Sequence, residues 1–144
     1  MKGPSVRVTK RYRFAASHRL HSPAFSDEEN RTMFGKCNNP HGHGHNYQVE
    51  IAVRGEVDPD SGRAVDPDRL DRLVREHVLR ILDHSNMNAD VPEFKSEVPT
   101  TENLALLIER WLKQHWDGAF GEGPALEYVK VQETKNNTFQ TADR

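Results

Sequence analysis

The chain has 144 residues, the length of one domain, and its composition excludes several classes of function. Its 20 Lys and Arg residues and 22 Asp and Glu residues leave a net charge of −2, so no overall basic field would attract nucleic acid or an anionic membrane. No apolar run approaches the ~18 residues of a membrane span. Residues 1–5 lead into no apolar segment like that of a secretory signal, and one cysteine excludes an intrachain disulfide. We therefore expect a single cytoplasmic domain over residues 1–144.

Two long strands are expected in the first half of the chain. Apolar and polar residues alternate over residues 6–17, which predicts a half-buried strand. Residues 19–42 form a long excursion, in which Ser26 or Asp27 is placed to cap a short helix. Alternation resumes over residues 43–57 and predicts the second strand. An excursion of this length in a compact domain is usually functional or disordered.

Two helices and a hairpin follow in the second half. An acidic cap and a proline begin a helix over residues 66–82, whose apolar residues keep helical spacing. A second helix begins at Thr100 and is expected to break from Gly118 onward, before closing strands at 126–134 and 137–141. The order ββααββ predicts an α+β fold with two helices on one face of a four-stranded antiparallel sheet. The free edges and second face of such a sheet predict an oligomer.

The most informative stretch is Cys37-Asn38-Asn39-Pro40-His41-Gly42-His43-Gly44-His45. His43 and His45 project from one face of a strand, and two neutral imidazoles form half of a zinc site. His18 is the candidate third ligand because it continues the inward face of the neighbouring strand. Three histidines leave one position open, as in catalytic zinc sites. A polar loop is the alternative for the glycine-interleaved histidines, and a surface position is the alternative for His18.

Three further residues are candidates for catalysis, each with an ordinary alternative. Cys37 is either a small buried hydrophobe or, beside a cation and Lys36, an ionised base or nucleophile. Asp83 and His84 follow the first helix, where His84 could simply compensate the helix dipole. Adjacent side chains on a regular element point apart, so a hydrogen bond between these two needs an irregular backbone.

Two acidic positions are candidates for ligand binding. The segment Thr100-Thr101-Glu102 fits a helix cap, and this is its ordinary interpretation. Glu133 continues the inward face that Val129 and Val131 occupy. A carboxylate there suits a ligand with paired N–H donors, and a solubilising charge on an edge strand is the alternative.

Together these motifs resemble the 6-pyruvoyl-tetrahydropterin synthase family. The matching stretches keep their order from about residue 12 to residue 137: Phe14–Leu20, Ser26–Asn30, Phe34–Pro40, Gly42–Tyr47, Leu82–His84, Thr100–Asn103 and Glu133–Thr134. The resemblance implies the tunnelling fold, in which trimers close their sheets into a β-barrel and two trimers form a homohexamer. The 116–124 segment is longer than the family usually carries.

The resemblance also implies the roles of individual residues. The implied Zn²⁺ ligands are His18, His43 and His45. The implied catalytic residues are Cys37, Asp83, His84 and Glu133, with Asp83 and His84 contributed across a subunit interface. The implied pterin-binding residues are Thr100, Thr101, Glu102 and Glu133. Arg19 and Lys36 are candidate partners for a triphosphate.

The implied reaction is that of a zinc-dependent lyase in tetrahydrobiopterin biosynthesis. It converts 7,8-dihydroneopterin triphosphate to 6-pyruvoyl-tetrahydropterin and triphosphate, and it needs no nicotinamide because the side chain is oxidised as the ring is reduced.

Three alternatives stay open, of which a hydrolase that uses zinc-bound hydroxide is the least favoured. The first is 6-carboxy-tetrahydropterin synthase of queuosine biosynthesis, whose histidine pair begins four residues after the cysteine, where His41 stands in this chain. The stretches Phe34–Pro40 and Asn46-Tyr47 favour the pair that begins at His43. The second alternative is a non-catalytic barrel that binds a pterin, which would need neither Cys37 nor the Asp–His pair.

Overall fold

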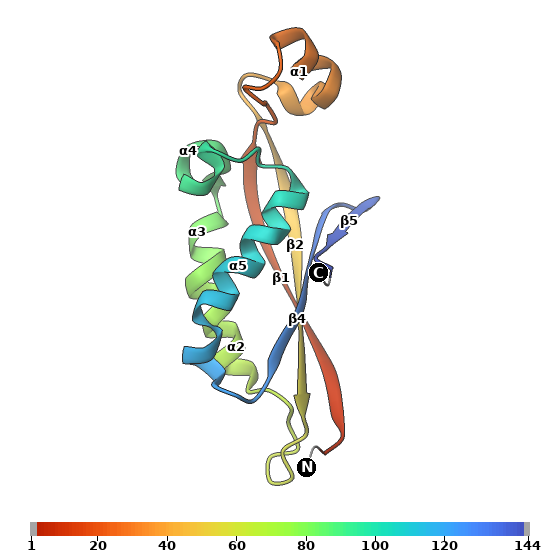
Figure 1. Ribbon diagram of the computed structural model, residues 1–144, viewed down its shortest axis with the longest axis vertical. Coiled ribbons are helices and arrows are strands. Elements are labelled where there is room, and N and C mark those ends of the chain that lie inside the picture. The colour runs from red at the N-terminus through yellow and green to blue at the C-terminus, as the bar shows by residue number, and fades with distance from the viewer. Residues whose placement is uncertain (1–2, 143–144) are drawn as a thin grey trace.

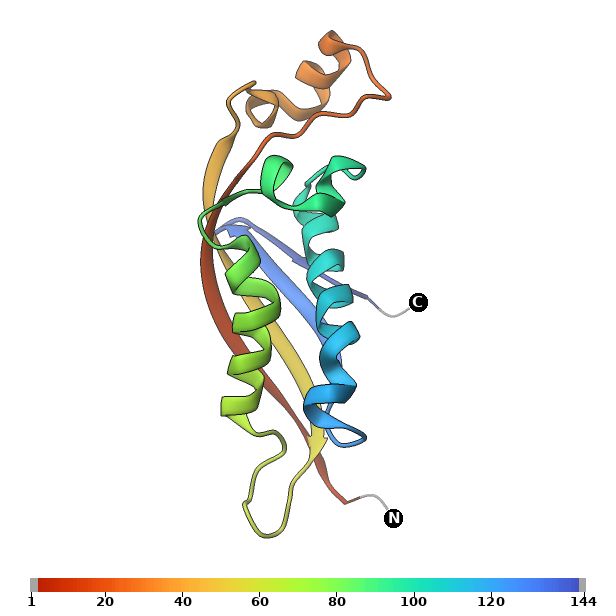
Figure 2. The same cartoon turned by 90° about the vertical axis from the view of Figure 1, so that its left-hand side faces the viewer.

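The computed structural model describes residues 3–142, and its framework is one twisted sheet with helices packed on one face (Figures 1 and 2). The strands lie in the order β3-β1-β2-β4-β5. Their bounds are Ser5–His18 (β1), His43–Glu56 (β2), Ser85–Asn86 (β3), Ala125–Thr134 (β4) and Asn137–Gln140 (β5). The α+β class and the four predicted strands are confirmed.

The sheet differs from the prediction at one edge. β1 pairs antiparallel with β2 along its length, whereas β3 pairs parallel with β1 at Ala16 and Ser17. The sheet is therefore five-stranded and mixed, and the prediction of a four-stranded antiparallel sheet is wrong in this respect. A strand of two residues has no periodicity, so the sequence pattern could not reveal it.

Two long helices cover the same face of the sheet (Figure 2). The first is continuous over residues 67–82 and consists of α2 (Pro67–Val74), the π-helical turn η2 (Arg75–Leu79) and α3 (Arg80–Leu82). Asp66 caps it, as predicted, by accepting hydrogen bonds from the backbone N–H groups of Asp68 and Arg69.

The second long helix, α5 (Thr101–Phe120), extends further than expected. It runs through Gly118 and ends at Gly121, which has a φ of 61°. A glycine inside a helix costs only about 0.5–1 kcal/mol, and the buried Trp116 holds this last turn by donating from Nε1 to the Pro124 carbonyl at 2.7 Å. The predicted break at Gly118 is therefore wrong.

The excursion at 19–42, here called the arm, projects beyond one end of the sheet (Figures 1 and 2). It contains α1 (Asp27–Phe34) and the 3-10 helix η1 (Gly35–Asn38). Ser26 rather than Asp27 is the cap of α1, in a reciprocal capping box with Glu29. Two short helices that the sequence did not predict, α4 (Met87–Asp90) and η3 (Pro92–Lys95), connect β3 to α5.

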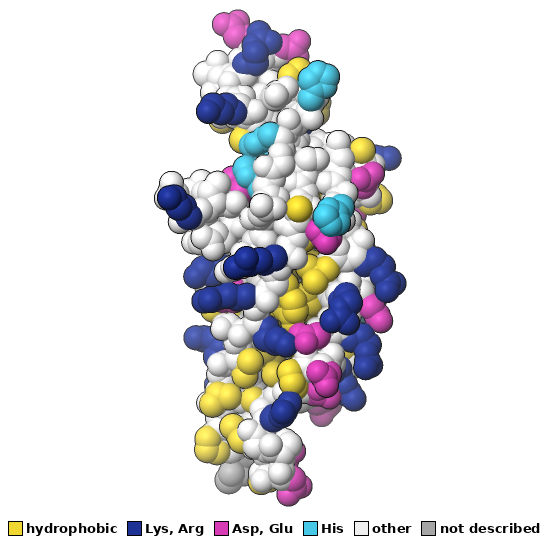
Figure 3. All heavy atoms as spheres, turned by 180° about the vertical axis from the view of Figure 1, so that it is seen from behind, with side chains coloured by type: hydrophobic (Ala, Val, Ile, Leu, Met, Phe, Trp, Pro, Cys, Tyr) yellow, Lys and Arg dark blue, Asp and Glu magenta, His cyan; other side chains and the backbone are white. Residues whose placement is uncertain are grey.

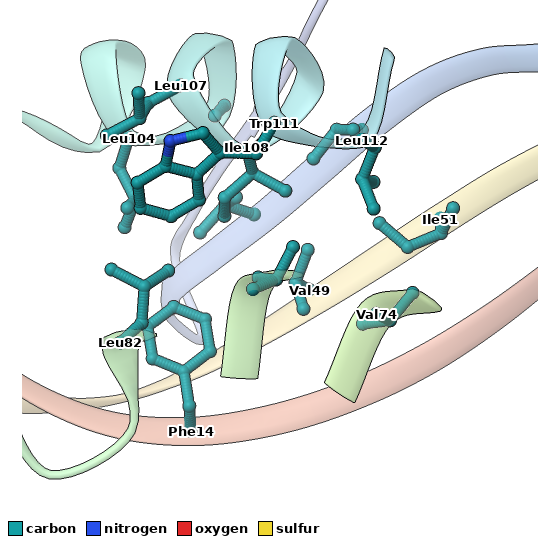
Figure 4. Packing of buried hydrophobic residues seen from close by; sticks show 14 of the residues in the cluster. Phe14, Val49, Ile51, Val74, Leu82, Leu104, Leu107, Ile108, Trp111 and Leu112 are labelled. Carbon is teal, nitrogen blue, oxygen red and sulfur yellow. The ribbon is translucent and has the colours of Figure 1, made fainter. Parts of the chain in front are cut away.

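The core lies between the sheet and the two long helices (Figure 4). Val49 and Ile51 of β2 pack towards Leu104, Ile108 and Leu112 of α5, and all five are fully buried. The other face of the sheet carries charged and hydrophobic side chains, and no helix of residues 3–142 covers it (Figure 3). In the same part of the chain, no helix is long and apolar enough to cross a membrane.

Candidate active site

Three histidines meet at the end of the sheet from which the arm leaves. The register of β1 and β2 places His18 opposite His43, and the two-residue repeat of β2 turns His45 to the same side. The ring centroids of His43 and His45 are 4.5 Å apart, and that of His18 is 5.1 Å from each. The structure thus brings the three predicted metal ligands together.

The free nitrogen atoms of these rings suit a metal ion. The Nε2 atoms of His18, His43 and His45 are buried and have no hydrogen-bond partner in the described part of the chain. Nδ1 of His18 lies 2.8 Å from the Pro99 carbonyl, which can only accept, so the proton belongs on Nδ1 and the lone pair on Nε2. Buried polar atoms are rarely left unpaired, and a cation among these three would satisfy all of them.

Electrostatics keeps two of the rings neutral, the form that binds metal. Burial is the main cause that lowers the pKa of His18, and the neighbouring His45 and His43 add to it, although the Pro99 carbonyl and the Glu133 carboxylate oppose the shift. Burial is also the main cause that lowers the pKa of His45, although the Glu133 carboxylate opposes the shift. Neutral imidazoles at neutral pH are the state that zinc or a similar ion requires.

Cys37 and Glu133 add two other kinds of donor to this centre. The ligand atoms of His18, Cys37 and His43 all lie within 4.8 Å of one another, and so do those of His18, His45 and Glu133. Nitrogen, sulfur and carboxylate oxygen are the donor types that zinc accepts. The donor set and the unpaired nitrogens therefore fit a metal ion.

The environment of Cys37 in the metal-free chain favours the neutral thiol. Burial and the nearby Glu133 carboxylate raise the pKa of the Cys37 thiol. Lys36, which the sequence suggested as a helper, is exposed. A bound cation would act in the opposite direction, so the ionisation expected from the sequence depends on the metal.

Glu133 lies on the inward face of its strand, as the sequence predicts, and two neighbouring side chains contact it. It lies near the end of β4, with Oε1 4.0 Å from Nε2 of His45, and Oε2 accepts a short hydrogen bond from the Thr101 hydroxyl. Thr101 is buried at the first turn of α5. The Thr101 hydroxyl of α5 therefore fixes the orientation of the Glu133 carboxylate.

The other two residues of the 100–102 segment have different surroundings. The Thr100 hydroxyl caps α5 by accepting from the Asn103 N–H at 3.2 Å, which is the ordinary interpretation of this segment. Glu102 is exposed on the first turn. Of the predicted pterin-binding residues, the structure thus joins Thr101 and Glu133 by a direct contact.

Asp83 and His84 lie at the outer edge of β1. Asp83 Oδ1 accepts from the Ala15 N–H at 2.9 Å, and the His84 N–H donates to the Ala15 carbonyl at 2.6 Å. His84 has a φ of 62°, an irregular backbone of the kind that the sequence argument required, and its Nε2 lies 3.6 Å from Asp83 Oδ2. The His84 side chain is 84% exposed. Within residues 3–142 of one chain, this pair belongs to neither metal-binding group.

Sequence reasoning missed two residues of the site. Tyr47 is buried, with its hydroxyl 3.5 Å from Nδ1 of His18 and its ring 5.4 Å from that of His45. Its position two residues after His45 on the same strand face was a usable signal. The Pro99 carbonyl is a backbone group, so no residue type could reveal it. His41 is exposed and belongs to neither metal-binding group of the described residues.

Comparison with known proteins identifies the family. A family model described as 6-pyruvoyl tetrahydropterin synthase matches residues 7–143. The chain belongs to this family.

Individual relatives agree with the family assignment. The chain is 47% identical over 134 residues to the 6-pyruvoyl tetrahydrobiopterin synthase of Homo sapiens, covering 92% of this chain and 88% of that protein. The structure of Caenorhabditis elegans 6-pyruvoyl tetrahydropterin synthase matches with a TM-score of 0.89 and 38% identity, over 100% of this chain and 99% of that one. A putative 6-carboxy-5,6,7,8-tetrahydropterin synthase of Archaeoglobus fulgidus is 34% identical over 87 residues, covering 60% of this chain and 68% of that protein.

Proposed function

We propose that this chain is a Zn²⁺-dependent lyase that converts 7,8-dihydroneopterin triphosphate to 6-pyruvoyl-tetrahydropterin and triphosphate in the cytoplasm. The observation that carries the proposal is the convergence of three unpaired Nε2 atoms beside a thiol and a carboxylate. Membership of the family and the similarity to the human enzyme support the choice of substrate.

Glu133 is proposed to bind the pterin ring. A pterin presents an amidine-like pair of N–H donors, and a carboxylate can accept both in a bidentate pair. The Thr101 hydroxyl fixes one carboxylate oxygen of Glu133, so the orientation is set before the substrate arrives. Thr100 and Glu102, at the start of the same helix, are proposed to line the pocket.

Cys37 is proposed to move the protons. Zn²⁺ held by His18, His43 and His45 would supply Lewis acidity towards the hydroxyl oxygens of the substrate side chain. The Cys37 thiolate would take a proton from the adjacent side-chain carbon, and the ring would gain a proton as the side chain is oxidised. The C=N bond of the ring would accept the electron pair that the side chain loses, so the reaction needs no external oxidant. Triphosphate would leave by elimination when its C–O bond breaks.

Asp83 and His84 are proposed to act in the site of a neighbouring subunit of a homohexamer. Two observations support this arrangement: the His84 imidazole is exposed, and β3 pairs with β1 at two residues only, which leaves most of that sheet edge open. A second chain could cover this edge and receive the Asp–His pair.

Product analysis tests the proposed reaction. Purified, zinc-loaded protein is incubated with 7,8-dihydroneopterin triphosphate, and triphosphate release and the mass of the pterin are followed. We expect triphosphate together with a 6-pyruvoyl product. A 6-carboxy product would assign the alternative activity, and tight pterin binding without turnover would mean a binding protein.

A further inference from the structure

We propose that Asn38 is a positioning residue that holds the Cys37 thiol at the metal centre. The proposal rests on the proposed role of Cys37. η1, the element that carries Cys37, has no side-chain cap, and Asn38 is its one buried residue. Gly35 and Lys36 are exposed. With no apolar anchor in η1, the place of Cys37 depends on the hydrogen bonds that the Cys37-Asn38 pair makes with residues 19–21.

Asn38 joins the outgoing and returning legs of the arm. Its Nδ2 donates to the Leu20 carbonyl at 2.7 Å and lies 3.1 Å from Nδ1 of His21. The Leu20 N–H donates to the Cys37 carbonyl at 2.7 Å. Both backbone groups of Leu20 are therefore bonded to the Cys37-Asn38 pair, and Arg19 Nε adds a hydrogen bond to the Asn38 carbonyl at 3.1 Å.

The outgoing leg is itself held firmly beside the metal centre. Arg19 directly follows the ligand His18, and Asn88 of α4 binds both of its backbone groups. Asn88 Oδ1 accepts from the Arg19 N–H at 2.7 Å, and Asn88 Nδ2 donates to the Arg19 carbonyl at 2.9 Å. The Asn88 amide thus makes the two hydrogen bonds that a neighbouring β-strand would otherwise make with the Arg19 backbone. The hydrogen bonds of Asn38 therefore connect Cys37 to residues 19–21, and the position of these residues is fixed relative to His18.

The arm offers a matched control in Asn30. Asn30 is fully buried, and its Nδ2 donates to the backbone carbonyls of Ser22, Phe25 and Ser26. Its hydrogen bonds stay within the loop around α1 and do not involve η1. The isosteric substitutions Asn38→Asp and Asn30→Asp remove the same kind of donor from the same arm.

The measurement uses the fact that Cys37 is the only cysteine. The rate of alkylation of the full-length, metal-free protein by iodoacetamide therefore reports on this thiol alone. We expect Asn38→Asp to raise the rate at least about threefold because the thiol leaves its half-buried place. We expect Asn30→Asp to leave the rate within about twofold of the wild type.

Turnover provides the second readout. A displacement of about 1 Å at a reacting group costs about 10²-fold in rate, so kcat of Asn38→Asp should fall by about that factor. KM and the zinc content should stay within about twofold, since the metal ligands and Glu133 are untouched. Asn30→Asp should keep wild-type kinetics.

Two results would overturn the proposal. The first is an equal alkylation rate for Asn38→Asp and the wild type. The second is an equal rise of the alkylation rate in Asn38→Asp and Asn30→Asp, which would mean a general loosening of the arm. If the aspartate variants fail to fold, Asn38→Ala and Asn30→Ala repeat the comparison without a buried charge. Absence of turnover in the wild type would contradict the proposed reaction alone, because alkylation is read without substrate.

Discussion

At the scale of single residues, some groups of the site can be predicted from the sequence and others cannot. His18, His43 and His45 are visible because strand alternation places them on one face. The Pro99 carbonyl that orients His18 is a backbone atom supplied by a distant loop, so residue identity carries no sign of it. From the sequence alone, Asn38 cannot be distinguished from an ordinary loop residue; its burial in the structure sets it apart. The convergence of the three histidines is therefore predictable here, whereas the groups that orient them are not.

The lowered pKa of His18 predicts a pH dependence of stability. The unfolded chain gains a proton at this ring near the ordinary pKa of 6.5, whereas the folded, metal-free chain gains it only at lower pH. The unfolded state thus binds more protons in this window, and the free energy of unfolding falls as the pH drops below about 6.5.

Urea unfolding in the presence of a chelator, between pH 7.5 and pH 5.5, measures this dependence. His18→Gln should reduce the slope because one titrating group is gone, and the lowered pKa of His45 should sustain the remainder. A slope that His18→Gln leaves unchanged would show that other groups cause it.

At the scale of elements, long periodic segments were predictable and short irregular ones were not. The two strands that carry the histidines and the capped start of α2 follow directly from alternation and from Asp66-Pro67. β3 and α4 are too short to have a period, and they form because the chain runs along the edge of β1. α5 continues through Gly118 because tertiary contacts of Trp116 outweigh the local preference. The sequence argument required an irregular backbone for a hydrogen bond between Asp83 and His84, but it did not predict that such a turn forms.

The turn at His84 predicts an unusual order of stability among substitutions. Its φ of 62° is unfavourable for any residue with a Cβ atom, by roughly 1 kcal/mol or more. His84→Gly should therefore unfold with a free energy about 1 kcal/mol higher than His84→Ala, although glycine usually destabilises a chain. Chemical denaturation of the two variants gives the difference directly, and a more stable alanine variant would contradict the strain at this position.

At the scale of the whole molecule, the proposed active site takes residues from two chains. The sheet has an open edge and an uncovered face, and the Asp–His pair belongs to neither metal-binding group of residues 3–142. Family membership was predictable from the ordered motifs, and the assembly is a proposal that rests on the open sheet edge and the exposed His84 imidazole.

Mixed assembly tests the sharing of sites between chains. Cys37→Ala and His84→Ala should each be inactive alone. If each site takes Cys37 from one chain and His84 from another, random co-assembly of equal amounts should restore about one quarter of the wild-type activity. Activity measured after co-expression or after mixing from denaturant gives the answer. No recovery in verified mixed oligomers would mean that each chain completes its own site.

The pairing of His18 with His43 across two hydrogen-bonded strands has a consequence for the evolution of this site. The strand register fixes the separation of these proposed ligands, so the length of the chain that joins them does not set it. Insertions or deletions in the arm would alter the number of residues between the first and second ligand and leave the coordination geometry intact. Sequence patterns with a fixed spacing across the arm would therefore miss genuine relatives. A change of one residue within His43-Gly44-His45, by contrast, would turn one histidine to the other face of the sheet.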